Sequence, residues 1–278
     1  MSAEIAKQRI GFLGGGAMAQ ALATGLVRAG VPVRQLLASD PEPARREALA
    51  ASPGVRAVWD NAEVVEASDA VVLAVKPGVV GPALRALERL PAAARLRPLW
   101  ISIAAGVALS SLEDSLARGA RIVRAMPNTP ALVGAGATAL VANAATGEAD
   151  RGLARALFES VGIVWEAPAE DLLDAVTGLS GSGPAYVCVF LEALGDAGVR
   201  MGLPREAAYA LSFQTVLGTA RLALETGRHP AALRDQVTSP GGTTIAGLER
   251  LEAGGLRAAV HAAVAAATER SRELGKKR

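Results

Sequence analysis

A glycine-rich turn near the start of the chain limits its fold more narrowly than any other feature. Gly14, Gly16 and Ala19 form a G-x-G-x-x-A pattern, which follows the apolar run 9–13 and precedes helically spaced apolar residues at 21–26. In a strand–turn–helix unit, the first glycine permits the tight turn and the second lets the backbone approach a pyrophosphate. The small third residue permits close packing of helix on strand. The pattern therefore predicts a dinucleotide-binding unit in preference to a purely structural glycine turn.

Apolar runs and helical spacing alternate through the amino-terminal half. This alternation predicts an α/β fold, a Rossmann-type doubly wound parallel sheet with helices on both faces. The expected strands after the first are 35–39, 70–75, 99–103, 121–125, 138–143 and 162–166, and the expected helices among them are 41–51, 79–90, 109–116 and 148–160.

The pattern changes after residue 166, beyond which only helical spacing remains. We therefore expect two domains, a dinucleotide-binding domain at 1–166 and an all-helical carboxy-terminal domain at 167–278. The expected helices of the second domain are 185–201, 205–226, 229–237, 243–251 and 256–274. A Gly/Ser-rich break at 178–186 precedes the first of them, and it indicates either exposed backbone donors or a hinge.

Ligands of such sheets bind at the carboxyl ends of the strands. Asp40 closes the second strand, where a carboxylate typically accepts a hydrogen bond from the adenosine ribose and selects NAD. Arg45 and Arg46 follow about one helical turn later and could instead meet the 2′-phosphate of NADP, although plain surface charge is the simpler interpretation. These residues do not decide whether the coenzyme is NAD or NADP. Lys76, at another strand end, is expected to contact coenzyme hydroxyls, with a solvated loop lysine as the alternative.

A second anion site is predicted at 239–244, which reads Ser-Pro-Gly-Gly-Thr-Thr just before helically spaced apolar residues. Proline and two glycines leave backbone N–H groups bare at a helix start, and such a terminus favours anions. Thr243 and Thr244 add two small hydroxyls. An ordinary glycine turn with a helix cap is the competing interpretation.

Composition excludes several classes of function. The 278 residues carry a net charge of only +2 and no basic stripe, so nucleic acid is not an expected partner. Cys188 is the single cysteine, which excludes an intramolecular disulfide and suits a cytoplasmic location. The uncharged stretch 10–27 contains five glycines, so it suits a strand–turn–helix unit better than a membrane helix. No histidine, cysteine and carboxylate spacing suggests a metal site.

The second half also lacks an obvious acid or base. It contains no lysine before Lys276, and its two histidines are His229, in a turn, and His261, in an Ala-rich helix. We therefore expect the chemistry to depend on positioning more than on a strong acid or base. Hydride transfer to a protonated C=N bond fits this requirement, because an iminium is intrinsically electrophilic.

The chain resembles the pyrroline-5-carboxylate reductase family along essentially its whole length. The resemblance rests on six segments, of which the last two are the most specific: 11–18, 74–77, 102–107, 124–130, 178–186 and 239–245. It implies reduction of pyrroline-5-carboxylate to L-proline by NAD(P)H, the last step of proline biosynthesis. It also implies a helical domain that interlocks between subunits as a homodimer, often assembled to a decamer, with each active site between one subunit's coenzyme crevice and its partner's helical domain.

The resemblance also implies roles for individual residues. The coenzyme site would comprise Gly14, Gly15, Gly16, Ala17 and Met18 at the pyrophosphate, with Ser39, Asp40, Asn61, Ala74, Val75, Lys76, Pro77, Ala104, Ala105 and Pro127 around them. The substrate carboxylate would be bound by Ser239, Gly241, Gly242, Thr243 and Thr244. The Thr244 hydroxyl would reach the imine nitrogen as the catalytic group, or solvent would supply that proton.

Asp40 departs from the family pattern, since NADPH-using relatives often carry a small polar residue there. An acidic side chain would repel a 2′-phosphate, so the usual NADPH and the alternative NADH are both expected coenzymes. The nearest rival function is that of a β-hydroxyacid dehydrogenase, which needs a lysine base that the helical half lacks. A deazaflavin-dependent NADP reductase would leave 178–186 and 239–244 unexplained. A non-catalytic dinucleotide sensor would bind coenzyme without turnover.

Overall fold

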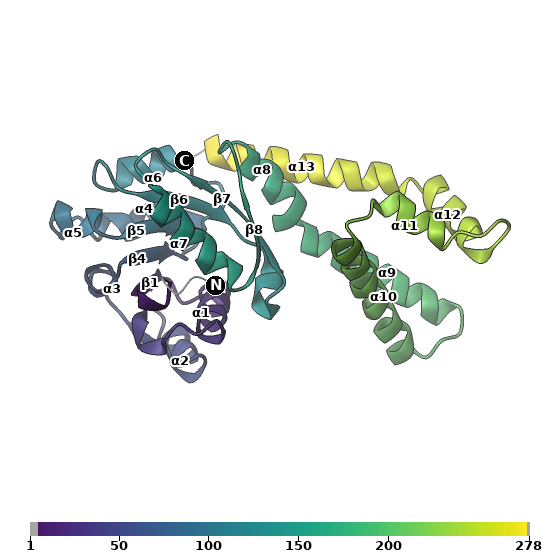
Figure 1. Cartoon of the computed structure of the whole chain (residues 1–278), viewed down its shortest axis with the longest axis horizontal. Helices are drawn as coiled ribbons and strands as arrows, with labels where there is room; N and C mark the ends of the chain where they lie inside the picture. The colour runs from purple at the N-terminus through teal and green to yellow at the C-terminus, as the bar shows by residue number, and fades with distance from the viewer. Residues whose placement is uncertain (1–4, 277–278) are drawn as a thin grey trace. The chain divides into compact units, whose positions relative to one another are not determined.

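The computed structural model describes residues 5–276, and Figure 1 shows its helices and strands. The chain folds into two compact units. The first contains the chain up to Ser182 together with the part from Ala266 onward, and the second is Gly183–Ala265. The domain boundary expected at residue 166 stays a prediction.

The first unit is built on one eight-stranded sheet in the order β3-β2-β1-β4-β5-β6-β7-β8. Every neighbouring pair is parallel except β6 and β7. The chain runs outward from β1 to β3 and then resumes on the other side of β1 with β4, which confirms the doubly wound fold. The strands are β1 (Ile10–Leu13), β2 (Leu36–Ser39), β3 (Arg56–Val58), β4 (Ala70–Leu73), β5 (Leu99–Ser102), β6 (Ile122–Met126), β7 (Gly136–Ala142) and β8 (Gly162–Glu166).

The reversal at β7 has a local cause. Only the short 3-10 helix η3 (Thr129–Val133) separates β6 from β7, and a parallel return would need a crossover of a dozen residues or more. The chain therefore turns back antiparallel. The crossover helix α7 (Glu148–Glu159) then restores the parallel direction for β8.

Alternate residues of the central strands enter separate apolar cores on the two faces of the sheet. Phe12 and Ile101 belong to the core under α1 (Ala17–Arg28) and α7, whereas Leu13 and Trp100 belong to the opposite core. This explains why the central strands are buried on both faces and mostly apolar. The remaining helices of this unit are α2 (Pro43–Ala51), α3 (Asn61–Ala67), α4 (Pro77–Arg85), α5 (Ala92–Leu96), α6 (Leu109–Ser115) and α8 (Leu172–Val176), with 3-10 helices η1 (Ile5–Lys7) and η2 (Val33–Gln35).

The Gly/Ser-rich segment expected to break the chain is instead helical. Residues Thr177–Gly181 form a π-helix, η4, that follows α8 directly and ends just before α9. A side chain at Gly181 would lie 2.6 Å from Met126 Cε, so this turn packs closely against the end of β6. The expectation of a break was therefore wrong for these residues, because a wide helical turn accommodates glycines there without leaving the helix.

The second unit consists of helices, as expected. They are α9 (Gly183–Arg200), α10 (Arg205–Thr226), α11 (Pro230–Gln236), α12 (Thr243–Ala253) and the first part of α13 (Leu256–Lys276). The helices α9 and α10 form a hairpin, in which a side chain at Gly195 would meet the Tyr209 ring at 2.9 Å. Over residues 5–276, no helix combines the length and the apolar character that a membrane crossing needs.

Candidate functional site

The glycine turn between β1 and α1 requires glycine at its first position. Gly14 has φ of 101°, and a Cβ there would lie 2.7 Å from the Ala74 carbonyl oxygen. Its N–H donates to the Ser39 carbonyl at 2.7 Å. The turn is thus wedged between the ends of β2 and β4, at the point where the strand order reverses. This is where open α/β sheets bind their ligands.

Gly16 lies two residues further along, and its surroundings differ. It occupies the N-cap of α1 with φ of −69°, and no side chain caps this helix. A Cβ built on Gly16 would meet no atom within 4 Å. Open space therefore lies over a helix start whose first N–H groups lack side-chain partners, which is the cradle that a dinucleotide pyrophosphate needs. The residues present fit a dinucleotide.

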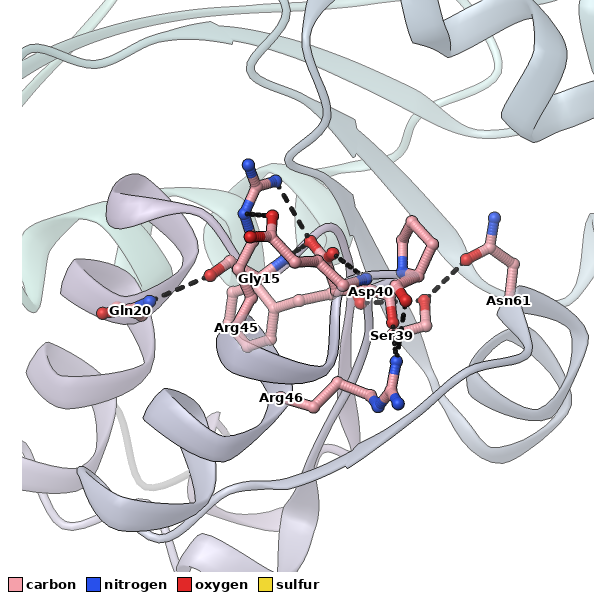
Figure 2. A network of polar contacts seen from close by, with 10 residues as sticks. Gly15, Gln20, Ser39, Asp40, Arg45, Arg46 and Asn61 are labelled. Atoms are coloured by element: carbon pink, nitrogen blue, oxygen red, sulfur yellow. Dashed lines mark hydrogen bonds and ion pairs between the residues drawn. The ribbon is translucent and has the colours of Figure 1, made fainter.

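Asp40 lies beside this turn, but its carboxylate points inward. The side chain is only 3% exposed. One carboxylate oxygen accepts from the Gly15 N–H at 2.8 Å, and the other accepts from the Glu42 N–H at 2.9 Å. Figure 2 shows this network, in which Gln20 also donates to the Gly15 carbonyl at 2.9 Å. The carboxylate thus ties the glycine turn to the loop that follows β2.

Two arginines and a polar pair complete the end of β2. Arg45 binds the Glu42 carboxylate at 2.8 Å and lies 3.5 Å from that of Asp40. Arg46 donates instead to the carbonyls of Asp40 and Pro41, at 2.7 and 3.0 Å. Buried Ser39 donates to Asn61 Oδ1 at 2.7 Å, which places the first residue of α3 beside the turn.

The other expected coenzyme residues lie along the same edge of the sheet. Ala74, Val75, Lys76 and Pro77 follow β4, and Lys76 is the N-cap residue of α4. Ala104 and Ala105 follow β5, the parallel neighbour of β4, and Pro127 follows β6. Within this set, the contacts above bring the glycine turn together with Ser39, Asp40, Asn61 and Ala74.

The expected substrate segment lies in the second unit, between α11 and α12. Gly241 has φ of 66°, and Gly242 is the N-cap of α12 without a side-chain cap. The Gly242 N–H donates to the Ser239 carbonyl at 3.1 Å, and a side chain at Gly242 would overlap Ser239 Oγ. The Thr243 side chain is exposed and that of Thr244 is half-buried. The turn therefore needs its glycines and leaves a bare helix start, as its sequence predicts.

Two polar contacts of the first unit were not anticipated from the sequence. The Asn128 amide donates to the Ser180 carbonyl at 3.1 Å and accepts from the Ala137 N–H at 2.9 Å, so it fastens the π-helix to the end of β6. The Arg124 side chain, 9% exposed, binds Glu170 at 2.6 Å. Asn128 and Arg124 thus reach residues more than forty positions away, and periodicity carries no signal for such pairs.

Comparisons with known families match both halves of the chain. A family described as pyrroline-5-carboxylate reductase dimerisation matches residues 170–274, and one described as NADP oxidoreductase, coenzyme F420-dependent, matches residues 9–106. A pyrroline-5-carboxylate reductase of Synechocystis sp. is 49% identical to this chain and aligns with 97% of it and 99% of itself. The enzyme of that name from Pisum sativum is 46% identical, and 95% of each sequence is aligned.

Solved structures agree with the sequence relatives. A pyrroline-5-carboxylate reductase from Coxiella burnetii has a TM-score of 0.88 at 39% identity, and 96% of this chain and 98% of that one are covered. A pyrroline carboxylate reductase from Plasmodium falciparum, solved with NADP bound, has a TM-score of 0.86 at 34% identity with the same coverage. Identity of this order over nearly the full length of both proteins places the chain in the pyrroline-5-carboxylate reductase family.

Proposed function

We propose that this protein reduces pyrroline-5-carboxylate to L-proline with a hydride from NAD(P)H, the last step of proline biosynthesis. The observation that carries the proposal is the open helix start at Gly16, in a chain whose nearly full-length relatives bear this enzyme's name. The sequence-based rival, a β-hydroxyacid dehydrogenase, would need a lysine base that the helical half lacks before Lys276.

The coenzyme of this reaction is a nicotinamide dinucleotide, with NADPH preferred and NADH as the alternative. When bound, its reduced ring supplies the hydride. Gly14 keeps the turn tight, Gly16 keeps the cradle open, and the α1 amides bind the pyrophosphate. The other coenzyme residues expected from the sequence line the adjoining strand ends. A relative solved with NADP bound supports this assignment, as does the NADP oxidoreductase family match.

The substrate carboxylate binds the bare start of α12 in this proposal. The amides of Gly241, Thr243 and Thr244 and the Ser239 hydroxyl are its donors, since a helix start favours an anion. The Gly242 amide closes the turn on the Ser239 carbonyl. Holding the carboxylate there fixes the imine relative to the segment. Hydride adds to the imine carbon and the C=N π electrons pass to nitrogen. A proton from solvent, either directly or relayed through the Thr244 hydroxyl, completes the secondary amine.

The Thr244 hydroxyl is free to hydrogen bond to the substrate. The threonines of α10 donate back along their own helix, as Thr215 does to the Leu211 carbonyl at 2.7 Å. For Thr244, the residue four positions earlier is Pro240, which precedes the helix. Among the described residues, the Thr244 hydroxyl has no hydrogen-bond partner, so it can donate to a bound ligand.

The second unit also pairs with another copy of the chain in this proposal. Helices α9 and α10 expose large apolar side chains, among them Val189 at 67%, Leu217 at 62% and Leu224 at 79%. A monomer rarely leaves so many large apolar side chains in water. The dimerisation family match over 170–274 supports a homodimer. Assembly to a decamer and a cytoplasmic location stay predictions, as does the domain division at residue 166.

Initial rates of NADPH and NADH oxidation with pyrroline-5-carboxylate test the function. We expect turnover, and we expect Thr244→Ala to lower kcat about tenfold to a thousandfold, the range for one positioned donor. Thr215→Ala is the matched control, because its hydroxyl is already engaged within α10. Coenzyme binding without turnover would overturn the proposal in favour of a sensor. Full activity of Thr244→Ala would remove that hydroxyl from the reaction.

A further inference from the structure

The end of β2 carries a buried carboxylate whose two oxygens both bind backbone amides of the protein. Both oxygens of Asp40 accept backbone N–H groups, those of Gly15 and Glu42. The side chain is 3% exposed, so a bound ribose has little access to the remaining lone pairs of these oxygens. The position is therefore unsuited to a ribose acceptor.

The negative charge of Asp40 is also compensated locally. Arg45 lies 3.5 Å from it and binds Glu42 at 2.8 Å, so this arginine faces two carboxylates of its own loop. Arg46 is different. A single guanidinium nitrogen, Nη1, donates to the carbonyls of Asp40 and Pro41. Its Nε and Nη2 have no partner among residues 5–276, and Figure 2 shows the guanidinium at the end of β2 beside Ser39.

From these contacts we propose that Asp40 is a positioning residue for the glycine turn and that Arg46 is the receptor for the 2′-phosphate of NADP(H). The inference rests on the dinucleotide site of the proposed function and refines its coenzyme preference. Arg46 is anchored on the turn that ends β2, where an arginine is suited to a 2′-phosphate. Two free donor nitrogens of a guanidinium can bind a phosphate bidentately.

The arrangement reverses the expectation drawn from the sequence. An aspartate at the end of β2 favours NAD when its carboxylate faces the ribose. Here the carboxylate faces the Gly15 amide, so it does not confront a 2′-phosphate directly. Asp40 instead holds the turn on which either coenzyme places its pyrophosphate. Its loss should therefore weaken both coenzymes, whereas loss of Arg46 should weaken only the phosphorylated one.

Calorimetric titration with NADP⁺ and NAD⁺, without substrate, separates the two roles. For Arg46→Gln we expect NADP⁺ to bind about tenfold to a hundredfold more weakly, as for loss of a charge-assisted contact, with NAD⁺ changed less than about twofold. Arg34→Gln, an equal charge change at the exposed η2 before the opposite end of β2, should leave both dissociation constants unchanged. Unchanged NADP⁺ binding to Arg46→Gln would overturn the assignment of the receptor.

Asp40→Asn tests the positioning role. We expect both coenzymes to bind more weakly, with the ratio of their dissociation constants kept within about threefold, since the shared pyrophosphate contact is lost. Hydrogen exchange at the Gly15 amide should accelerate more than at β4, which a general loss of stability would not produce. Tighter NADP⁺ binding together with weaker NAD⁺ binding would show that the carboxylate faces the ribose, and would overturn this role. If Asp40→Asn does not fold, Arg46→Gln still decides the receptor.

The inference and the proposed function fail separately. The titrations need no pyrroline-5-carboxylate and no hydride transfer. Selective loss of NADP⁺ in Arg46→Gln, in a protein that does not reduce pyrroline-5-carboxylate, would refute the reaction and keep the receptor. Turnover of pyrroline-5-carboxylate, together with an Arg46→Gln variant that binds NADP⁺ and NAD⁺ in the wild-type ratio, would support the reaction and refute the receptor.

Discussion

Replacing Gly16 by alanine should separate coenzyme binding from folding. A Cβ at this position meets no atom within 4 Å, and φ of −69° with ψ of 178° is open to any residue. Alanine restricts the unfolded chain more than glycine does, which adds about 0.4–1 kcal/mol to the free energy of unfolding. Alanine is a poorer N-cap than glycine, which offsets part of that gain. The free energy of unfolding of the ligand-free protein should therefore change by less than about 1 kcal/mol.

The added methyl group should nevertheless occupy the space that a pyrophosphate needs. If the coenzyme binds a hundredfold more weakly, its stabilising effect falls predictably. At a concentration about one hundred times the wild-type Kd, ligand adds about 2.7 kcal/mol to wild-type stability but only about 0.4 kcal/mol to the variant. For a domain of this size, the Tm increase should drop from roughly 5–10 °C to under about 2 °C.

Thermal denaturation with and without NADPH measures both quantities. Gly14→Ala is the matched comparison, because φ of 101° and the 2.7 Å approach to the Ala74 oxygen should destabilise the ligand-free protein by about 2–5 kcal/mol. A Gly16→Ala protein that keeps the full ligand-induced Tm increase would refute the pyrophosphate cradle. A Gly16→Ala protein that unfolds as readily as Gly14→Ala would refute the assignment of open space.

Three further substitutions test the packing and charges of the first unit. Gly25→Ala should destabilise the protein by about 1–3 kcal/mol in chemical denaturation, because the new Cβ would overlap Val161 on the turn after α7. Glu170→Ala should cost about 2 kcal/mol by the same measurement, since it leaves a buried arginine without its carboxylate, and Glu170→Gln should cost less. The hydrogen bond from Arg9 holds the pKa of Asp69 below its ordinary value of 3.8, so the ionised form stabilises the fold above that pH and this contribution is lost as the pH falls further. The Tm deficit of Asp69→Asn, worth less than about 1 kcal/mol for an exposed pair, should therefore be present at about pH 7 and should shrink as the pH falls below 3.8.

The sequence predicted the sheet well because its central strands are unambiguous. The expected strand at 70–75 and the observed β4 differ only at the end, where Ala74 and Val75 leave the sheet to enter the loop. The sequence did not predict β3, which has three residues at the sheet edge with none fully buried. An edge strand so short carries too few apolar positions for periodicity to register.

The site was predicted less completely, for a different physical reason. Motif spacing located the turn at Gly14 and Gly16 and the helix start after Gly242, since local backbone geometry determines both. The direction of the Asp40 carboxylate depends on which amide hydrogen bonds it, and Gly15 lies 25 positions away. Tertiary hydrogen bonds of this kind leave no periodic pattern. The sequence therefore could not tell whether the Asp40 carboxylate faces the coenzyme ribose or its own loop.

The three glycines of the turn show how one motif combines separate constraints. Gly14 is required by backbone conformation and by a close carbonyl. At Gly15, a Cβ would lie 2.9 Å from Leu49 Cδ1, so the buried Leu49 side chain would have to shift. Gly16 meets neither constraint, and within the protein its advantage over alanine is only that of an N-cap residue. Folding would tolerate alanine at Gly16 but not at Gly14. Because the bare helix start at Gly16 lies where the strand order reverses, a ligand that approaches the backbone there gives a second reason for glycine.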